Sequence, residues 1–310
     1  MNGHEQSTSY ILMVRPEAFG YNPQTAESNA FQSNDGALTN EEIRNKAREE
    51  FDTFATDLSN KGVNVMVIKD THEPETPDAV FPNNWITTHE DGTIITYPME
   101  APLRRLERRD DVIYTCAEKF VVKKRHYLEF YEDDQKYLEG TGSMIFDRAN
   151  KIVYSCRSTR THPMVLNEFC QITGYRPVVF SAVDGNNHPI YHTNVMMAMG
   201  DEFVVICMES IKTEEERSRL YEIFSSTGKD VIEITFEQVN SFAGNMLQVL
   251  NSRNQRIMVM SEQAYNSLRA DQIERIRQYA QILYSPLYTI ENYGGGSARC
   301  MIAEIFLPEK

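Results

Sequence analysis

The chain has 310 residues, of which 41% are hydrophobic and 25% are charged, a composition typical of soluble globular proteins. Its formal net charge of −14 would repel phosphate backbones and anionic lipid headgroups, so we expect neither nucleic acid nor a membrane as a partner. The N-terminus lacks a basic region followed by a long apolar run, and no stretch reaches about 18 apolar residues, which together favour a cytoplasmic location.

Five cysteines occur in the sequence, widely separated and without a CxxC pair, so neither a disulfide framework nor a zinc site is indicated. Four of them lie within apolar segments and are expected to be buried and unreactive. These four are Cys116, Cys156, Cys170 and Cys207. The fifth, Cys300, follows a glycine-rich run instead.

In chain order, the first predicted element is a strand over Tyr10–Val14. The segment Phe19–Asn40 that follows is polar and too long for an ordinary connection, which predicts either a substrate lid or a disordered surface loop. Apolar periodicity then predicts four longer helices, several of which begin at a Ser, Thr or Asn cap. They span Asn40–Asn60, Thr161–Thr173, Thr213–Thr227 and Ser261–Ala280.

Four β-hairpins of similar composition are predicted at regular intervals, each with β-branched and apolar runs around a turn of Asp, Asn or Gly. They are Trp85–Tyr97, Ser143–Cys156, Val195–Met208 and Met246–Met260. A fifth, partial copy at Cys300–Leu307 has one strand, and the N-terminal strand is its expected partner. A short strand precedes each copy, at Val63–Ile68, His126–Phe130, Pro177–Phe180, Val231–Thr235 and Ile282–Tyr284.

Five strand–hairpin–helix units predict one α/β domain over residues 1–310, arranged as a ring with approximate fivefold symmetry. The N-terminal strand would complete the last unit, and this closure would leave fewer open sheet edges. The alternative is an ordinary α/β domain of two halves, which alternating strands and helices also permit.

In such a ring, equivalent positions of successive units lie near the axis, so polar residues at the hairpin entrances would converge. Those positions hold Asn83, Asn84, Glu139, His192, Asn194, Asn245, Arg299 and Cys300. A thiol, an imidazole and a carboxylate in one place are the groups of nucleophilic catalysis. The thiol is the nucleophile, the imidazole carries protons, and the carboxylate orients the imidazole. The neighbouring Arg299 would favour the thiolate of Cys300. His188 competes with His192, but it precedes a proline in a predicted loop.

Seven motifs resemble, in order, those of the guanidine-modifying (pentein) superfamily, which includes arginine deiminases, dimethylarginine dimethylaminohydrolases and glycine amidinotransferases. They are PDAVFPNNW (Pro77–Trp85), APLRRLE (Ala101–Glu107), LEGTGSMIFDR (Leu138–Arg148), SCRSTRT (Ser155–Thr161), YHTN (Tyr191–Asn194), FAGN (Phe242–Asn245) and GGGSARCM (Gly294–Met301). The resemblance implies a five-bladed α/β propeller that acts as a carbon–nitrogen hydrolase. It also implies that Cys300 is the nucleophile, His192 the general acid/base and Glu139 the acid that orients it.

The same resemblance implies the substrate contacts. Asp78 and Phe81 resemble pocket residues that hold the amino-acid end of the substrate and flank its chain. Arg104 and Arg160 resemble the arginines that bind its α-carboxylate, a task suited to the guanidinium fork. The resemblance also implies that Asn245, in the FAGN motif, is a substrate-binding residue.

Two departures from the deiminase pattern bear on the substrate. Deiminases hold the cationic guanidinium with carboxylates, whereas this chain has Asn84 and Asn194 at the corresponding places. An amide donates and accepts hydrogen bonds without a negative charge, so it suits a neutral ureido group better. This favours hydrolysis of citrulline to ornithine, ammonia and carbon dioxide, and the chain is similar to citrulline-utilisation hydrolases. The route needs no cofactor.

Two alternatives stay open at this point. One is an enzyme that resembles an arginine deiminase or dimethylarginine dimethylaminohydrolase, for which Asp78 and Glu139 supply the negative charge. The other is a non-catalytic propeller that binds an amino acid, although a binding module would need neither a nucleophile nor an acid/base pair. A small-molecule amino-acid substrate is the expected partner in each case, and a homo-oligomer is compatible with the sequence.

Overall fold

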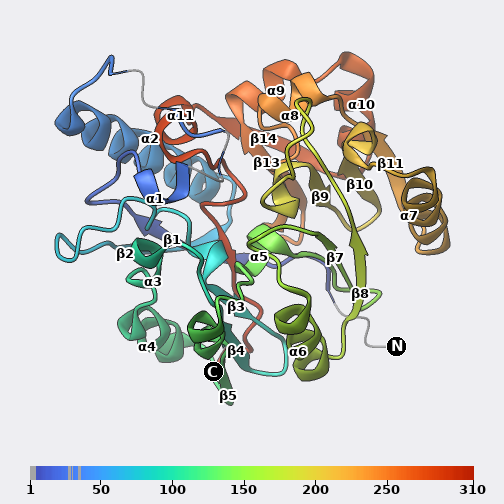
Figure 1. The fold of residues 1–310 in the computed structure, drawn as a ribbon. Coiled ribbons are helices and arrows are strands. Elements are labelled where there is room, and N and C mark those ends of the chain that lie inside the picture. The colour runs from blue at the N-terminus through green and yellow to red at the C-terminus, as the bar shows by residue number, and fades with distance from the viewer. Residues whose placement is uncertain (1–4, 27–28, 30, 34–35) are drawn as a thin grey trace.

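A computed structural model describes residues 5–26, 29, 31–33 and 36–310 of the chain. Within these residues it has five sheets of three strands each (Figure 1). The strands are β1 (Tyr10–Arg15), β2 (Asn64–Lys69), β3 (Ile86–Thr88), β4 (Thr93–Thr96), β5 (Lys124–Tyr127), β6 (Ile145–Asp147), β7 (Ile152–Cys156), β8 (Arg176–Phe180), β9 (Met197–Met199), β10 (Phe203–Ile206), β11 (Asp230–Glu233), β12 (Leu247–Leu250), β13 (Arg256–Ser261), β14 (Gln281–Ser285) and β15 (Ala303–Glu304).

All five sheets have the same pairing. The middle strand pairs antiparallel with one neighbour and parallel with the other, in the orders β15-β1-β2, β3-β4-β5, β6-β7-β8, β9-β10-β11 and β12-β13-β14. The predicted partnership of the two chain ends is confirmed, because Ile11 of β1 lies opposite Glu304 of β15 and Leu12 lies opposite Ala303. The internal repeat is therefore present as five equivalent sheets.

The repeating unit differs from the predicted strand–hairpin–helix order. The strand before each hairpin belongs to the sheet of the preceding hairpin, which it joins in parallel after a helical connection. A parallel partner needs a crossover, and the helix between the strands supplies it. The unit is therefore hairpin, helix and parallel strand.

The longer helices lie toward the outside of the molecule, whereas the short helix Gly140–Ser143 lies near its middle (Figure 1). The α-helices are α1 (Pro23–Ala26), α2 (Asn40–Asn60), α3 (Pro102–Arg105), α4 (Asp110–Lys119), α5 (Gly140–Ser143), α6 (Pro163–Thr173), α7 (Glu214–Ser226), α8 (Phe236–Asn240), α9 (Glu262–Ser267), α10 (Ala270–Tyr279) and α11 (Tyr288–Gly294). Short 3₁₀ helices are η1 (Pro82–Asn84), η2 (Glu129–Asp134), η3 (Thr193–Val195) and η4 (Met208–Ser210). None of the helices in the described ranges has the length and apolar character of a membrane span.

Helix α2 begins and ends where its sequence predicts. Thr39 and Glu42 form a capping box at its N-terminus, which satisfies two backbone N–H groups that would otherwise lack partners. The predicted helix Ser261–Ala280 is wrong in its continuity: Leu268 is extended and buried, and it separates α9 from α10. The backbone N–H of Arg269 donates to Gln272 Oε1 at 2.8 Å where α10 then starts.

Two further predictions need correction. The strand expected at His126–Phe130 lies earlier, at Lys124–Tyr127, and the 3₁₀ helix η2 follows it. Cys170 is only half-buried, on α6, whereas Cys116, Cys156 and Cys207 are buried as expected.

Apolar clusters connect each sheet to the next. One joins Leu12 of β1 and Ala303 of β15 with Ile94 of β4, and another joins the β3–β5 and β6–β8 sheets. A third spans the β6–β8, β9–β11 and β12–β14 sheets, and a fourth joins β12–β14 with β1 and α2. These clusters leave the segments just before β3, β6, β9, β12 and β15 beside one another, and those segments carry the polar residues of the site.

Candidate active site

Glu139 and His192 are in direct contact. Glu139 is the N-cap of α5 and His192 is the N-cap of η3, and His192 Nε2 lies 2.8 Å from Glu139 Oε2. Burial lowers the pKa of His192 to about 4, against the opposing pull of Glu139. Burial resists ionisation of Glu139, but the charge of Arg160 and the bond with His192 outweigh it, so the pKa of Glu139 lies below its ordinary value. The pair is thus an anionic carboxylate and a neutral imidazole near pH 7.

Cys300 is buried, and two amides lie against its sulfur. Asn194 Nδ2 donates to Cys300 Sγ at 3.3 Å and Asn245 Nδ2 donates at 3.2 Å. Hydrogen bonds to the charged form of a group favour that form, so the two donors favour a thiolate. The guanidinium of Arg299, which was predicted to favour the thiolate, binds Glu304 and the Ile302 carbonyl, and its charge also attracts negative charge on Cys300.

Gly142, in α5, allows His192 and Asn84 to approach its backbone. A Cβ atom at this position would overlap Asn84 Nδ2 and would lie 2.8 Å from Nδ1 of His192. Because Nε2 of His192 is bonded to Glu139, Nδ1 is the ring nitrogen left for proton transfer to a substrate.

Arg104 lies on α3 and is buried among polar groups. It forms a bidentate pair with Glu107, with both N–O distances 2.9 Å, and it donates to Asn84 Oδ1 at 2.8 Å and to the Phe81 carbonyl at 3.3 Å. Its Nε lies 3.8 Å from Asp78 Oδ2. These contacts use four of its five N–H groups, which leaves one for a ligand.

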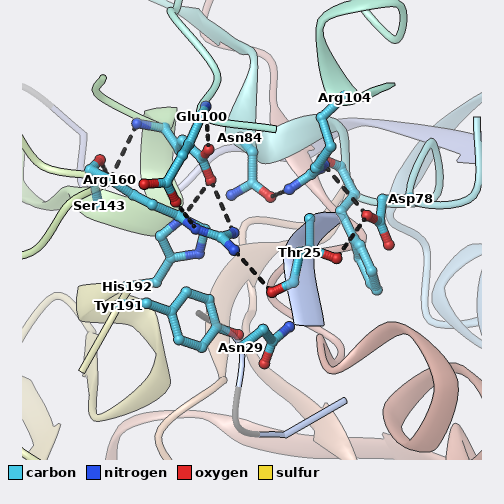
Figure 2. Close-up of polar contacts among 12 residues, drawn as sticks. Thr25, Asn29, Asp78, Asn84, Glu100, Arg104, Ser143, Arg160, Tyr191 and His192 are labelled. Carbon is cyan, nitrogen blue, oxygen red and sulfur yellow. Dashed lines mark hydrogen bonds and ion pairs between the residues drawn. The ribbon is translucent and has the colours of Figure 1, made fainter. Parts of the chain in front are cut away.

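Arg160 is held between two carboxylates and an aromatic ring (Figure 2). It donates to Glu139 Oε2 at 3.3 Å and to Glu100 Oε2 at 3.1 Å, and its guanidinium lies 4.9 Å from the centre of the Tyr191 ring. It also donates to the backbone carbonyl of Thr25. Of its two carboxylate partners, Glu139 is fully buried and Glu100 is 29% exposed.

One small pocket is lined by Asp78, Phe81, Asn84, Arg104, Arg160, Tyr191, His192, Gly294–Gly296 and Cys300, and by Thr25 and Asn29 from the predicted lid segment. Glu139 contacts His192, and Asn194 and Asn245 contact Cys300, from outside this lining. Asn22 and Thr25 both donate to Asp78 Oδ2, and Asn29 donates to the Gly294 and Gly295 carbonyls. The described part of the segment Phe19–Asn40 therefore lies over the pocket, and residues 27, 28, 30, 34 and 35 lie outside the described residues. About 20 Å³ of free space remains inside.

Among the described residues, three buried polar atoms at this site have no hydrogen-bond partner: Asp78 Oδ1 and Asn84 Nδ2, whose residues line the pocket, and Asn194 Oδ1 beside Cys300. Buried polar atoms are normally paired, so such a group of unpaired atoms is the expected mark of a polar ligand. Burial also raises the pKa of Asp78, against the charge of Arg104.

The structure thus brings together all ten residues predicted from the sequence: Cys300, His192, Glu139, Asp78, Phe81, Asn84, Arg104, Arg160, Asn194 and Asn245. Sequence reasoning missed Glu107, Glu100, Tyr191 and Gly142. Glu107 follows Arg104 by three residues in a predicted motif, a spacing that would have suggested a pair. The rival His188 is exposed and pairs with Asp184. Within the described ranges, no group of three or more His, Cys, Asp and Glu could hold a metal ion.

Comparison with solved structures shows which proteins share this fold. The arginine dihydrolase ArgZ, from the ornithine–ammonia cycle in cyanobacteria, matches with a TM-score of 0.71 and 16% identity over 95% of this chain, which spans only 40% of ArgZ. The N-terminal domain of ArgZ, covalently bound to a reaction intermediate, matches with a TM-score of 0.72 and 15% identity, over 96% of this chain and 99% of that domain.

A dimethylarginine dimethylaminohydrolase matches with a TM-score of 0.64 and 15% identity, over 96% of this chain and 99% of its own. Its structure is an adduct with S-methyl-L-thiocitrulline. No curated protein sequence matches this chain significantly.

Fold and family place the chain in the guanidine-modifying, or pentein, superfamily. It belongs to the family described as eukaryotic N,N dimethylarginine dimethylhydrolase, whose model matches residues 15–307.

Proposed function

We propose that this protein is a cysteine hydrolase that converts free citrulline to ornithine, ammonia and carbon dioxide. The observation that carries the proposal is the pattern of atoms at the site that have no hydrogen-bond partner in the described part of the chain: one donor, Asn84 Nδ2, and two acceptors, Asp78 Oδ1 and Asn194 Oδ1. A ureido group presents one acceptor oxygen and several N–H donors, which complements this set. A guanidinium presents donors alone, so it would leave Asn84 Nδ2 opposite another donor.

The orientation of the Asn84 amide is supported by its neighbour. Arg104 is a donor without acceptors, and its Nη1 lies 2.8 Å from the atom assigned as Asn84 Oδ1. The opposite orientation would place two donors together, so the hydrogen-bond network requires Nδ2 to face the pocket. Arg104 therefore has a positioning role in addition to the predicted contact with the α-carboxylate.

The proposed reaction follows from the positions of the three central residues. Cys300 adds to the ureido carbon while its thiol proton passes to His192, and His192 gives that proton to the leaving δ-nitrogen, so that ornithine departs and a carbamoyl thioester remains. Water then attacks the thioester, with His192 accepting its proton, and the carbamate released decomposes to ammonia and carbon dioxide. Glu139 stabilises the imidazolium that forms in each half of the reaction.

The α-amino and α-carboxylate groups of the substrate must bind on the side of the pocket away from the ureido group. Arg160 is suited to the carboxylate, because its partner Glu100 is partly exposed and could turn into solvent when a substrate carboxylate takes its place. The free space of about 20 Å³ is too small for an amino acid, so the segment Phe19–Asn40 must open for entry and act as a lid.

We also propose that residues 1–310 form one domain and that its five sheets close as a five-bladed propeller.

A second candidate has its own support. Asp78 offers an unpaired carboxylate oxygen, which would suit a cationic guanidinium, and the family model and ArgZ both point to arginine derivatives. The reaction would then give citrulline, or ornithine by two successive hydrolyses.

Mass spectrometry of products separates these candidates. Purified wild type and Cys300→Ala would be incubated with citrulline, arginine, dimethylarginine and N-acetylcitrulline. Ornithine from citrulline in the wild type alone is the expected result. Turnover of arginine or dimethylarginine without turnover of citrulline would replace the proposal by the second candidate. If none of the four compounds is turned over, and a thiol probe labels Cys300 no faster than Cys170, the result would favour a binding protein without catalysis.

A further inference from the structure

Three glycines, Gly294–Gly296, connect the end of helix α11 to the turn that carries Cys300, and all three line the active-site pocket. A side chain would not fit there, because a Cβ atom at Gly294 or Gly296 would lie 2.9 Å or 2.8 Å from the Phe81 ring. Glycine has the greatest conformational freedom of any residue, so such a run does not fix its own shape. The position of Cys300 therefore depends on contacts made on either side of the run.

The turn that carries Cys300 begins at Ser297, which is fully buried. The carbonyl of Ser297 accepts the backbone N–H of Cys300 at 2.9 Å and that of Met301 at 3.3 Å. The hydroxyl of Ser297 donates to Oε1 of Glu291 at 2.6 Å. Ser297 thus joins the backbone of the nucleophile to a carboxyl group on α11.

Glu291 holds the glycine run at both ends. Its backbone carbonyl accepts the N–H of Gly295 at 2.9 Å, where α11 ends, and its side chain accepts the hydroxyl of Ser297. The hydroxyl of Ser261, at the end of β13, also interacts with this carboxyl group. These contacts connect the glycine run to the β12–β14 sheet.

The carboxyl group of Glu291 lies where ionisation is costly, since only 2% of the residue is exposed. Burial raises its pKa to about 7, while the hydrogen bonds of Ser261 and Ser297 act in the opposite direction. The 2.6 Å distance to Ser297 lies in the range of a hydroxyl bonded to a carboxylate, about 2.5–2.7 Å. Without this bond the buried carboxylate would lose compensation for its burial, so we expect a firm contact.

We propose that Glu291 is a positioning residue for the nucleophile, which acts through Ser297 to fix the glycine run and the turn that carries Cys300. Glu291 does not line the active-site pocket, so it would act only through this contact. Correct placement of the turn keeps the sulfur of Cys300 against the amides of Asn194 and Asn245, at 3.3 Å and 3.2 Å. The effect on turnover rests on the proposed function, whereas the effect on the reactivity of Cys300 does not.

The first test is the rate of alkylation of Cys300 by iodoacetamide, measured by peptide mass spectrometry at about pH 8, where Glu291 is mostly ionised. The half-buried Cys170 is the internal reference, so the result is the ratio of the two rates. Ser297→Ala removes the donor, and Glu291→Asp withdraws the acceptor by one methylene. Each should lower the ratio by about fivefold or more, because the sulfur moves relative to its amide donors. Glu291→Gln keeps an acceptor oxygen at full length and should stay within about twofold of wild type.

Glu50→Gln is the matched control. Glu50 is a half-buried carboxyl group on α2 that accepts the backbone N–H groups of Thr289 and Ile290, at the other end of α11. It supports the same helix without touching the glycine run. Glu50→Gln is therefore expected to reduce stability and to leave the ratio of Cys300 to Cys170 alkylation unchanged.

The second test uses turnover of citrulline. Ser297→Ala and Glu291→Asp should lower kcat by about tenfold or more and change KM by less than about threefold, because the groups that bind the substrate keep their places. The double variant should be no slower than the slower single variant, since both changes act through one contact. Circular dichroism shows which variants fold, and Ser297→Ala, which removes one oxygen atom, serves alone if Glu291→Asp does not.

An alkylation ratio that is unchanged or raised in the folded variants would overturn the positioning role. A double variant whose loss is the product of the two single losses would also overturn it, because Glu291 would then act independently of Ser297. Absence of citrulline turnover in the wild type would contradict the proposed function alone, and the alkylation ratios would still decide the role of Glu291.

Discussion

Asn245 holds its amide toward Cys300 by two contacts with the backbone. Its Oδ1 accepts the N–H of Arg299 at 3.0 Å, and its Nδ2 donates both to the Asn194 carbonyl at 3.0 Å and to Cys300 Sγ at 3.2 Å. Because one backbone group binds Oδ1 of Asn245 and another binds Nδ2, the orientation of the amide is fixed. The N–H that faces the sulfur is therefore preorganised. A donor in this place stabilises negative charge on Cys300 before any substrate arrives.

Replacing Asn245 by Ala should therefore slow the alkylation of Cys300, because the sulfur loses one of the two amide donors that stabilise negative charge on it. A hydrogen bond to a charged group is worth about 1.5–3 kcal/mol, so we expect the rate to fall by about tenfold or more. The check is the rate of iodoacetamide alkylation of Cys300 as a function of pH, followed by peptide mass spectrometry. The exposed Asn266→Ala is the matched control and should leave the profile unchanged. An identical profile for both variants would mean that Asn245 does not tune the thiol.

Gly142→Ala should reduce kcat/KM by about 100-fold, because the new methyl group would displace His192 Nδ1 and Asn84 Nδ2 by a sizeable fraction of an ångström. Gly185→Ala is the control, since a Cβ atom there would meet only Phe236, at an ordinary 3.9 Å. Steady-state kinetics and circular dichroism of both variants make the comparison. Full activity in a folded Gly142→Ala protein would contradict the proposed geometry of His192.

Asn84→Asp should shift preference from a ureido to a guanidinium substrate. The change replaces the donor Nδ2 by an acceptor oxygen and adds a negative charge that attracts a cation. We expect citrulline turnover to fall at least tenfold and the ratio of arginine to citrulline turnover to rise. Asn266→Asp adds the same charge at the surface and should leave the ratio as it is. A constant ratio in Asn84→Asp would contradict the role given to this amide.

The stability of the protein should depend on pH through His192. Its pKa is about 4 in the folded chain and 6.5 when free, so the unfolded state binds more protons between these values. The contribution of neutral His192 is therefore complete above pH 6.5 and is lost as pH falls toward 4, at roughly 1 kcal/mol per pH unit. Urea unfolding of wild type and His192→Gln at pH 7, about 5.5 and about 4.5 isolates this contribution. A difference between the two proteins that stays constant with pH would contradict it.

Glu107→Gln should destabilise the fold by about 3 kcal/mol, because it leaves the buried Arg104 without its bidentate partner. The matched control is Glu214→Gln, which breaks an exposed pair with Arg217 at the same i,i+3 spacing and should leave the stability nearly unchanged, because solvent screens that pair. Free energies of unfolding in urea give both values. Equal changes in the free energy of unfolding for the two variants would show that the buried Arg104–Glu107 pair stabilises the fold no more than an exposed pair does.

Local patterns in the sequence determined the hairpins, the long helix α2 and the segments that carry the ten site residues, because alternation of apolar residues, turn residues and caps act within a few positions. The parallel partner of each hairpin was decided only in the tertiary structure, since a strand that follows a crossover helix can join any exposed edge until the cores pack. The break at Leu268 has the same origin, because burial of that side chain outweighs the helical pattern around it. The partners of Arg160 and Arg104 depend likewise on distances between residues far apart in the chain, which sequence spacing does not encode.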